Sequence, residues 1–149
     1  NNEKKINYKK NKKFNSRINN IKKDVNNFLR KNNNTIGYGA STKGNIVLNH
    51  CKINKNNLKY ICDANPYKYN RYTPGSNIRI ISKNKMRKLK PKNLLVLIWS
   101  FRKEVIKQEK DFIKKGGRLI LHLPKLHIID KNNFKDFENS NFEKLSYNI

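Results

Sequence analysis

The residues best suited to chemistry form a glycine-rich turn, Gly37–Asn45, with the sequence Gly-Tyr-Gly-Ala-Ser-Thr-Lys-Gly-Asn. Small residues let the backbone approach a ligand closely, and a helix that follows such a turn directs its free N–H groups at the same space. Lys43 would add a positive charge, and Ser41 or Thr42 a hydroxyl donor. These groups together are suited to binding a phosphate.

The spacing of this turn matches neither of the two common phosphate-binding patterns. Its glycines, Gly37, Gly39 and Gly44, follow the order G-x-G-x-x-x-x-G, and Asn45 stands where a P-loop has lysine. The motif alone therefore leaves two interpretations. Either the glycines admit a phosphate, or they only allow a tight turn from a strand into a helix.

A second candidate is Asp63, which ends the next predicted strand. In doubly wound folds an acidic residue at this place often contacts a ribose hydroxyl. The alternative is that the carboxylate caps a turn or a helix. Because Asp63 follows the glycine turn at the expected distance, we favour contact with the ligand or organisation of the ligand loop.

The elements that must position these residues alternate between strands and helices. This alternation predicts parallel strands joined by right-handed crossovers, and therefore a Rossmann-like three-layer α/β domain with a mainly parallel sheet. The stretch 64–75 contains two prolines and a glycine and is expected to be an irregular ordered loop. Strands are expected at 35–38, 58–62, 78–81, 94–99 and 118–123. Helices are expected at 82–89 and 101–115, and after the glycine turn, where the helix carries Ile46, Val47, Leu48 and Cys51.

The two ends of the chain differ from this central part. An amphipathic helix is predicted from Phe14 to about residues 32–34, because apolar residues recur at three- and four-residue steps. Residues 1–13, rich in Asn and Lys, are interpreted as a disordered lead or a linker. The domain is expected to span 14–128. The tail 129–149 fits a docking helix, a docking strand or a frayed end.

The composition is strongly basic, with 35 Lys and Arg against 10 Asp and Glu and a formal net charge of +25. The basic residues are mostly lysines, and Asn and Ile are also abundant. Codons rich in A and T would raise all three together, so we attribute the charge to composition. The sequence predicts no specific nucleic-acid partner, and weak, salt-sensitive binding to polyanions.

Cys51 and Cys62 cannot form a four-ligand zinc site, and they do not form a disulfide framework. No metal site is expected in this chain. No apolar stretch approaches the ~20 residues that cross a membrane, and the polar start does not fit a signal peptide. A cytoplasmic location is therefore expected. His50 is expected on a helix surface and His122 in packing at a strand end.

Several ordered blocks resemble the C-terminal domain of the sugar C-methyltransferases, which methylate carbon 3 of nucleotide-linked keto-deoxysugars. The resemblance covers about residues 14–128. It departs from the family pattern at Asn70, Lys92 and Ser100, where Gly, Asp and Asn are usual, and Asn70 still tolerates a left-handed backbone. The blocks are Gly37–Asn45, Leu48 and Asn49, Asp63–Lys68, Arg71–Gly75, Trp99, Glu104, Gly116 and Gly117, and Pro124.

The resemblance implies a three-part enzyme, in which upstream domains bind zinc and S-adenosylmethionine and hold the catalytic base. This chain would bind the nucleotide-linked sugar, would contain no catalytic residue and would be inactive alone. Lys68 and Arg71 would meet diphosphate oxygens, and Tyr72 and Trp99 would offer flat faces to a ring. The alternative is a stand-alone nucleotide- or cofactor-binding module without methyl transfer. The implied substrate-binding positions are Gly37, Tyr38, Gly39, Ser41, Lys43, Gly44, Asn45, Asp63, Lys68, Arg71, Tyr72, Pro74 and Trp99.

Overall fold

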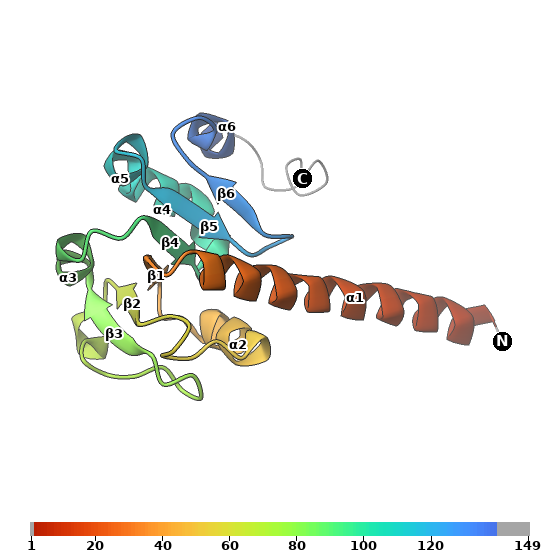
Figure 1. Ribbon diagram of the computed structural model, residues 1–149. Helices are drawn as coiled ribbons and strands as arrows, with labels where there is room; N and C mark the ends of the chain where they lie inside the picture. The colour runs from red at the N-terminus through yellow and green to blue at the C-terminus, as the bar shows by residue number, and fades with distance from the viewer. Residues whose placement is uncertain (1, 140–149) are drawn as a thin grey trace.

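The computed structural model describes residues 2–139, and the side chains of 14–138. Figure 1 shows a central sheet with helices on both faces and a long first helix that extends away from it. The strands are β1 Thr35–Tyr38, β2 Tyr60–Asp63, β3 Arg79–Ser82, β4 Asn93–Val96, β5 Arg118–Leu121 and β6 His127–Ile129. The helices are α1 Asn2–Lys31, α2 Thr42–Cys51, α3 Lys83–Lys88, α4 Arg102–Gln108, α5 Lys110–Lys114 and α6 Phe134–Asn139, with short 3-10 helices η1 Pro66–Lys68 and η2 Trp99–Phe101.

The six strands lie in the order β3-β2-β1-β4-β5-β6. All neighbours run parallel except β6, which pairs antiparallel with β5. This arrangement confirms the predicted Rossmann-like domain with a mainly parallel sheet. From β1 the chain adds strands on one side, β2 and β3, and then continues on the other side with β4 and β5. Open α/β sheets bind their ligands in the crevice between the two strands where this change of side occurs, here β1 and β4.

Each strand alternates its side chains between two apolar layers. In β4, Leu94 and Val96 face the layer that contains α3, α4, α5 and α6. Leu95 and the following Leu97 face the layer that contains α1 and α2. All four are fully buried, and a buried leucine contributes about 1.5–3 kcal/mol to stability relative to an exposed one. The continuous apolar run of β4 is thus explained by helices on both faces.

Helix α1 begins earlier than the sequence predicted. Its carboxyl-terminal part packs through Val25 and Leu29 against the sheet and α2, as the apolar spacing indicated. The helix, however, runs back to Asn2, through the residues interpreted as a disordered lead. A helix that is already nucleated gains one hydrogen bond per added residue, and lysine is a good helix former, so extension needs no apolar face.

The predicted helix 101–115 is divided in the structure. Helix α4 ends at Gln108 and α5 begins at Lys110, because Glu109 has non-helical backbone angles of φ −105° and ψ 15°. The apolar periodicity continues across this break, through Val105, Ile106 and Ile113, which are all buried. Periodicity therefore could not show where the helix changes direction.

Of the alternatives left open for the tail 129–149, the described part contains a docking helix, α6, while strand β6 ends at Ile129, where the tail begins. Strand β6 extends the sheet, and α6 buries Phe134 and Phe137 against α4. Residues 140–149 of the predicted tail lie outside the described residues. Within residues 2–139, no helix combines the length and the apolar character that a membrane crossing requires.

Candidate functional site

The glycine turn lies at the carboxyl end of β1, as predicted, and leads directly into α2. Gly39 has a positive φ of 89°, which glycine adopts without strain. Ser41 is the N-cap of α2, and its hydroxyl oxygen accepts a hydrogen bond from the Gly44 amide at 3.0 Å. The turn is therefore fixed by its own residues before any ligand binds.

Most amides of the turn are already bonded, which corrects the expectation that they point into open space. The Gly39 amide donates to the Cys62 carbonyl at 2.8 Å, and the Asn45 amide donates to the Ser41 carbonyl at 2.9 Å. The Ala40 amide donates to Asp63 Oδ2 at 2.8 Å. A ligand at this turn would therefore contact side chains more than backbone amides.

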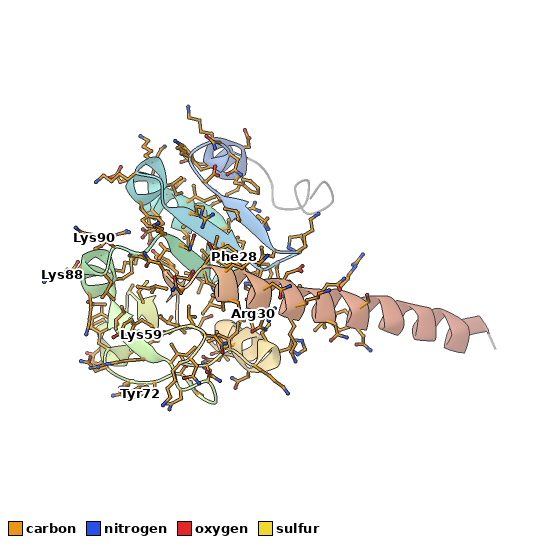
Figure 2. The ribbon with its side chains drawn as sticks, viewed as in Figure 1. Phe28, Arg30, Lys59, Tyr72, Lys88 and Lys90 are labelled. Carbon is orange, nitrogen blue, oxygen red and sulfur yellow. The ribbon has the colours of Figure 1, made fainter. Side chains whose placement is uncertain are left out.

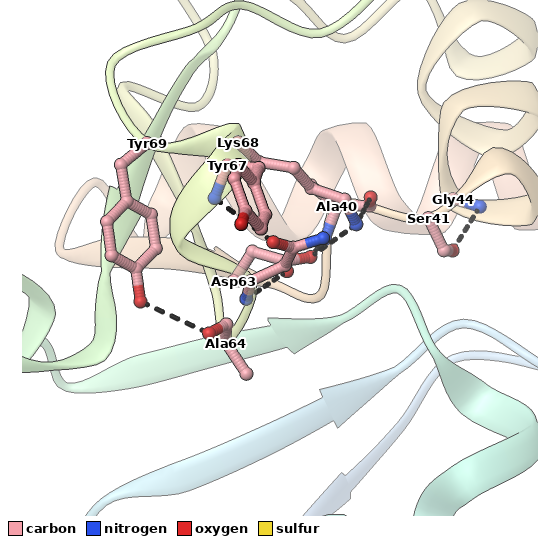
Figure 3. Close-up of polar contacts among 9 residues, drawn as sticks. Ala40, Ser41, Gly44, Asp63, Ala64, Tyr67, Lys68 and Tyr69 are labelled. Atoms are coloured by element: carbon pink, nitrogen blue, oxygen red, sulfur yellow. Dashed lines mark hydrogen bonds and ion pairs between the residues drawn. The ribbon is translucent and has the colours of Figure 1, made fainter.

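Asp63 organises the loops around the turn (Figure 3). Its Oδ2 accepts from the Ala40 amide and from Lys68 Nζ, at 2.8 and 3.1 Å, and its Oδ1 accepts from the Asn65 amide at 2.8 Å. Lys68 Nζ also donates to the Ala40 carbonyl at 2.9 Å. The Asp63 carboxylate thus accepts hydrogen bonds from the glycine turn and from the following loop. These contacts fit the hypothesis that Asp63 organises the ligand loop.

The predicted irregular loop 64–75 is held to the rest of the site at several points. Asn65 accepts a hydrogen bond from the Tyr67 amide at 3.0 Å and so begins the short helix η1. Asn49 Nδ2 on α2 donates to the Pro74 carbonyl at 3.1 Å. Asn70 adopts a φ of 64°, and so has the left-handed backbone that the sequence analysis allowed for an asparagine in place of glycine.

Two cavities open at this edge of the sheet and share Ser41 and Lys68. The first, which we call the loop cavity, has a volume of about 540 Å³ between α2 and the loop. Asn45 lies in its wall, and its Oδ1 is buried without a hydrogen-bond partner among residues 14–138. A donor group of a ligand would satisfy that oxygen. The predicted residues in its lining are Ser41, Asn45, Lys68, Arg71, Tyr72 and Pro74.

The second, which we call the switch-point cavity, has a volume of about 350 Å³ and lies between the carboxyl ends of β1 and β4. Five of the predicted residues line this cavity: Tyr38, Gly39, Ser41, Asp63 and Lys68. Lys83, Phe101, Glu104 and Gln108 also line this cavity, although they were not predicted as site residues. The strand order is the signal that could have found the last three, because η2 and α4 follow β4, which borders the crevice.

Tyr38 belongs to a buried polar network at the base of the switch-point cavity. Its hydroxyl donates to Glu109 Oε1 at 2.9 Å, and Glu109 pairs with Arg87. Burial, followed by the negative charge of Glu109, raises the pKa of the Tyr38 hydroxyl above its usual value. Burial also raises the pKa of the nearby Cys62 thiol to about 12. Both groups therefore stay protonated and neutral near neutral pH.

Other predicted positions lie outside both cavities. A Cβ on Gly37 would come within 2.7 Å of Ile61 Cγ1, and one on Gly44 within 2.9 Å of Leu97 Cβ. These two glycines are thus needed for close packing of β1 and α2. Lys43 is exposed on α2, and Trp99 is half-buried at the start of η2.

The histidines lie where the sequence analysis expected them. His50 is exposed on α2, and His122 is fully buried after β5. Burial lowers the pKa of His122 to about 4, so the imidazole is neutral near neutral pH. Because no solvent reaches His122 in this structure, it is a packing residue.

The sheet order, the glycine turn and the two cavities define a Rossmann-like α/β domain with a hollowed carboxyl edge. The chain belongs to the C-methyltransferase C-terminal domain family, whose model matches residues 1–124. It is 34% identical over 93 residues to the C-methyltransferase NovU of Streptomyces niveus. The alignment covers 62% of this chain and 22% of that protein. These findings confirm the resemblance drawn from the sequence.

Proposed function

We propose that this chain is the nucleotide-sugar-binding C-terminal domain of an S-adenosylmethionine-dependent sugar C-methyltransferase. Membership of the family supports the assignment to a methyltransferase. The observation that carries the substrate assignment is the pair of cavities at the carboxyl edge, joined at Ser41 and Lys68. A nucleotide-linked sugar has the matching shape, with two ring systems separated by a charged diphosphate.

In this proposal the diphosphate lies at the wall that the two cavities share. Lys68 Nζ has three donors, of which two are used by Asp63 and the Ala40 carbonyl, so one remains for a phosphate oxygen. The Lys68 side chain is 38% exposed. Arg71 lies beside it with an exposed guanidinium, which can form two parallel hydrogen bonds to a phosphate.

The rings of the ligand would then lie in the cavities on either side. In the loop cavity, Tyr72 is 56% exposed and is suited to stacking on a base (Figure 2). The buried Asn45 Oδ1 in the same wall would accept a hydrogen bond from a base N–H group. In the switch-point cavity, Lys83, Glu104 and Gln108 would contact the hydroxyl or keto groups of the sugar.

The methyl transfer itself belongs, in this proposal, to upstream domains that bind S-adenosylmethionine and zinc. The residues described here do not fit a zinc ion. Within residues 14–138 no three side chains of the metal-binding types lie together. Burial also raises the pKa of the thiols of Cys51 and Cys62, which zinc would need as thiolates. No catalytic role is therefore assigned to this chain.

Calorimetric titration of the chain with thymidine diphosphate and with a thymidine-diphosphate sugar tests this proposal. We expect Arg71→Gln to weaken binding roughly tenfold, because it removes a charged hydrogen bond to phosphate. Arg30→Gln is the matched control, since Arg30 is exposed on α1 and lies in neither cavity. Equal affinities of the two variants, or no binding of either ligand, would contradict the proposal.

A further inference from the structure

A further hollow lies at the opposite, amino edge of the sheet. It has a volume of about 1060 Å³ and lies where β4 and β5 begin, between α3 and α5. We call it the amino-edge groove. Its wall includes Lys92 and Gly117, which immediately precede these two strands. Gln108 at the end of α4 also lines the switch-point cavity, but the other residues of the groove line neither carboxyl-edge cavity.

The lining of the groove is strongly cationic. Asp111 is the acidic residue in this lining. Arg87 is paired with the buried Glu109, but the other basic residues of the groove form no ion pair with a carboxylate of residues 14–138. Figure 2 shows Lys88 and Lys90 at the edge of the molecule beside α3. The basic residues that line the groove are Arg87, Lys90, Lys92, Lys115 and Arg118.

Arg118 is held in place by groups that do not neutralise its charge. Its Nε donates to Asn93 Oδ1 at 2.8 Å, and its Nη2 donates to Asn32 Oδ1 at 3.0 Å. Asn93 is only 2% exposed and is itself fixed by a hydrogen bond to Thr35 Oγ1 at 3.2 Å. A guanidinium oriented by amide oxygens keeps its full charge for an outside anion. This differs from Lys68, whose carboxylate partner belongs to the chain.

The groove offers little besides charge. The Phe112 ring lies against Gly117 on one side, since a Cβ there would meet it at 2.4 Å, and the Arg87 guanidinium lies over the ring at 5.8 Å. The ring therefore has no free face for a base. The amides of Gly116, Gly117 and Arg118 all donate to carbonyls of the chain, so an extended peptide would find no free donors there.

We infer that the amino-edge groove is a second anion site, which binds a multiply charged phosphate chain through its lysines and Arg118. Compact phosphates match a dense cluster of lysine and arginine side chains better than single carboxylates do, because each phosphate offers several acceptor oxygens. The phosphate chain can be a free oligophosphate or the backbone of a nucleic acid. Gln108 lines both the groove and the switch-point cavity, but none of the basic residues of the groove lines a carboxyl-edge cavity, so the inference does not depend on the nucleotide-sugar proposal.

Titration of the chain with tripolyphosphate, and separately with a short oligodeoxythymidylate, tests this inference at about 50 mM salt. We expect the double variant Lys92→Gln/Lys115→Gln to bind at least one of the two probes roughly tenfold more weakly than the parent chain. The control is Lys55→Gln/Lys131→Gln, which removes the same charge from exposed turns outside the groove. It should bind like the parent. The difference between the probes identifies the source of the phosphates.

Amide chemical shifts locate the bound probe. Changes at Gly116–Arg118 without changes at Ala40–Asn45 would support the groove. Binding of neither probe, equal weakening in both double variants, or shift changes at Ala40–Asn45 in place of Gly116–Arg118 would overturn the inference. All four substituted lysines are exposed, so the variants should fold, and thermal unfolding of each verifies this. If the chain binds the probes but not thymidine diphosphate, the proposed function of the carboxyl edge fails and the inference about the groove is still supported.

Discussion

The two edges of the sheet differ in the groups that contact their basic side chains. At the carboxyl edge, Lys68 is tied to Asp63 and to the Ala40 carbonyl, and the result is a fixed set of loops around two cavities. At the amino edge, Arg118 is oriented by Asn93 and Asn32, which carry no charge. Charge is therefore used for internal organisation at one edge and is left available to a ligand at the other.

This contrast shows why net charge is a poor guide to function in this chain. Most of the lysines in residues 14–138 line neither the groove nor the carboxyl-edge cavities. The two edges differ in the partner of the cation. The carboxylate of Asp63 neutralises the charge of Lys68, whereas the amides of Asn93 and Asn32 leave the charge of Arg118 in place. The following substitutions compare the edges directly.

The largest difference is expected between two glycines that both have positive φ. Gly39, at the carboxyl edge, has φ 89°, and a Cβ there would lie 2.6 Å from Ile98 Cγ2. Gly39→Ala combines backbone strain with a clash and should cost about 3 kcal/mol in the free energy of unfolding. Gly116, at the amino edge, has φ 93° and no atom within 4 Å of such a Cβ. Gly116→Ala should cost about 1 kcal/mol.

Urea denaturation of the two variants measures this difference. If Gly39→Ala is no more destabilising than Gly116→Ala, the turn is looser than the structure indicates. The proposed ligand geometry, which depends on a fixed turn, would then lose its support.

The next largest effect is expected for the carboxylates of the two edges. Asp63→Asn loses the ion pair with Lys68 and places an amide N–H group near donors that the carboxylate satisfied. We expect a loss of about 2–3 kcal/mol in the free energy of unfolding. Asp111→Asn is the control, because Asp111 is exposed and forms no ion pair with residues 14–138. It should change stability by about 0.5 kcal/mol or less. Similar losses in both variants would show that Asp63 does not organise the loops.

A pH effect of about 2 kcal/mol is expected from His122. Its pKa of about 4 in the folded state lies below the usual value of 6.5. The unfolded chain therefore binds a proton that the folded chain does not, and stability falls as the pH falls from about 7.5 to about 5. His122→Phe, which has no titratable ring, should flatten this slope.

The exposed His50 provides the comparison, since His50→Gln should leave the slope of the parent chain unchanged. Denaturation curves at several pH values measure it. An unchanged slope in His122→Phe would mean that other groups cause the acid sensitivity.

The fold was largely predictable because its signals are local and repeated. Strand β1 has the bounds that the sequence predicted, and the apolar run after Pro91 became the central strand β4. The break at Glu109 was not predictable. It depends on a carboxylate that is buried against Tyr38 and Arg87, from distant parts of the chain.

The candidate site was predictable in place but not in detail. Sequence blocks brought Ser41, Lys68 and Tyr72 to one edge, because parallel strands end together there. They did not show that Asp63 would accept the hydrogen bond of the Ala40 amide. They also could not show the amino-edge groove, whose residues come from five separate segments and share no motif. Such a site depends on tertiary packing alone.

The smallest effect concerns two serines that cap helices in the same way. Ser41 Oγ accepts from the Gly44 amide at 3.0 Å, and Ser82 Oγ accepts from the Lys85 amide at 3.1 Å. Replacing either by alanine should cost about 1 kcal/mol in stability, because one helix amide loses its acceptor. Only Ser41 lines the carboxyl-edge cavities. Ser41→Ala should therefore also weaken binding of thymidine diphosphate, whereas Ser82→Ala should not. If the two variants bind equally well, Ser41 caps the helix only, and the diphosphate does not lie at the wall shared by the cavities.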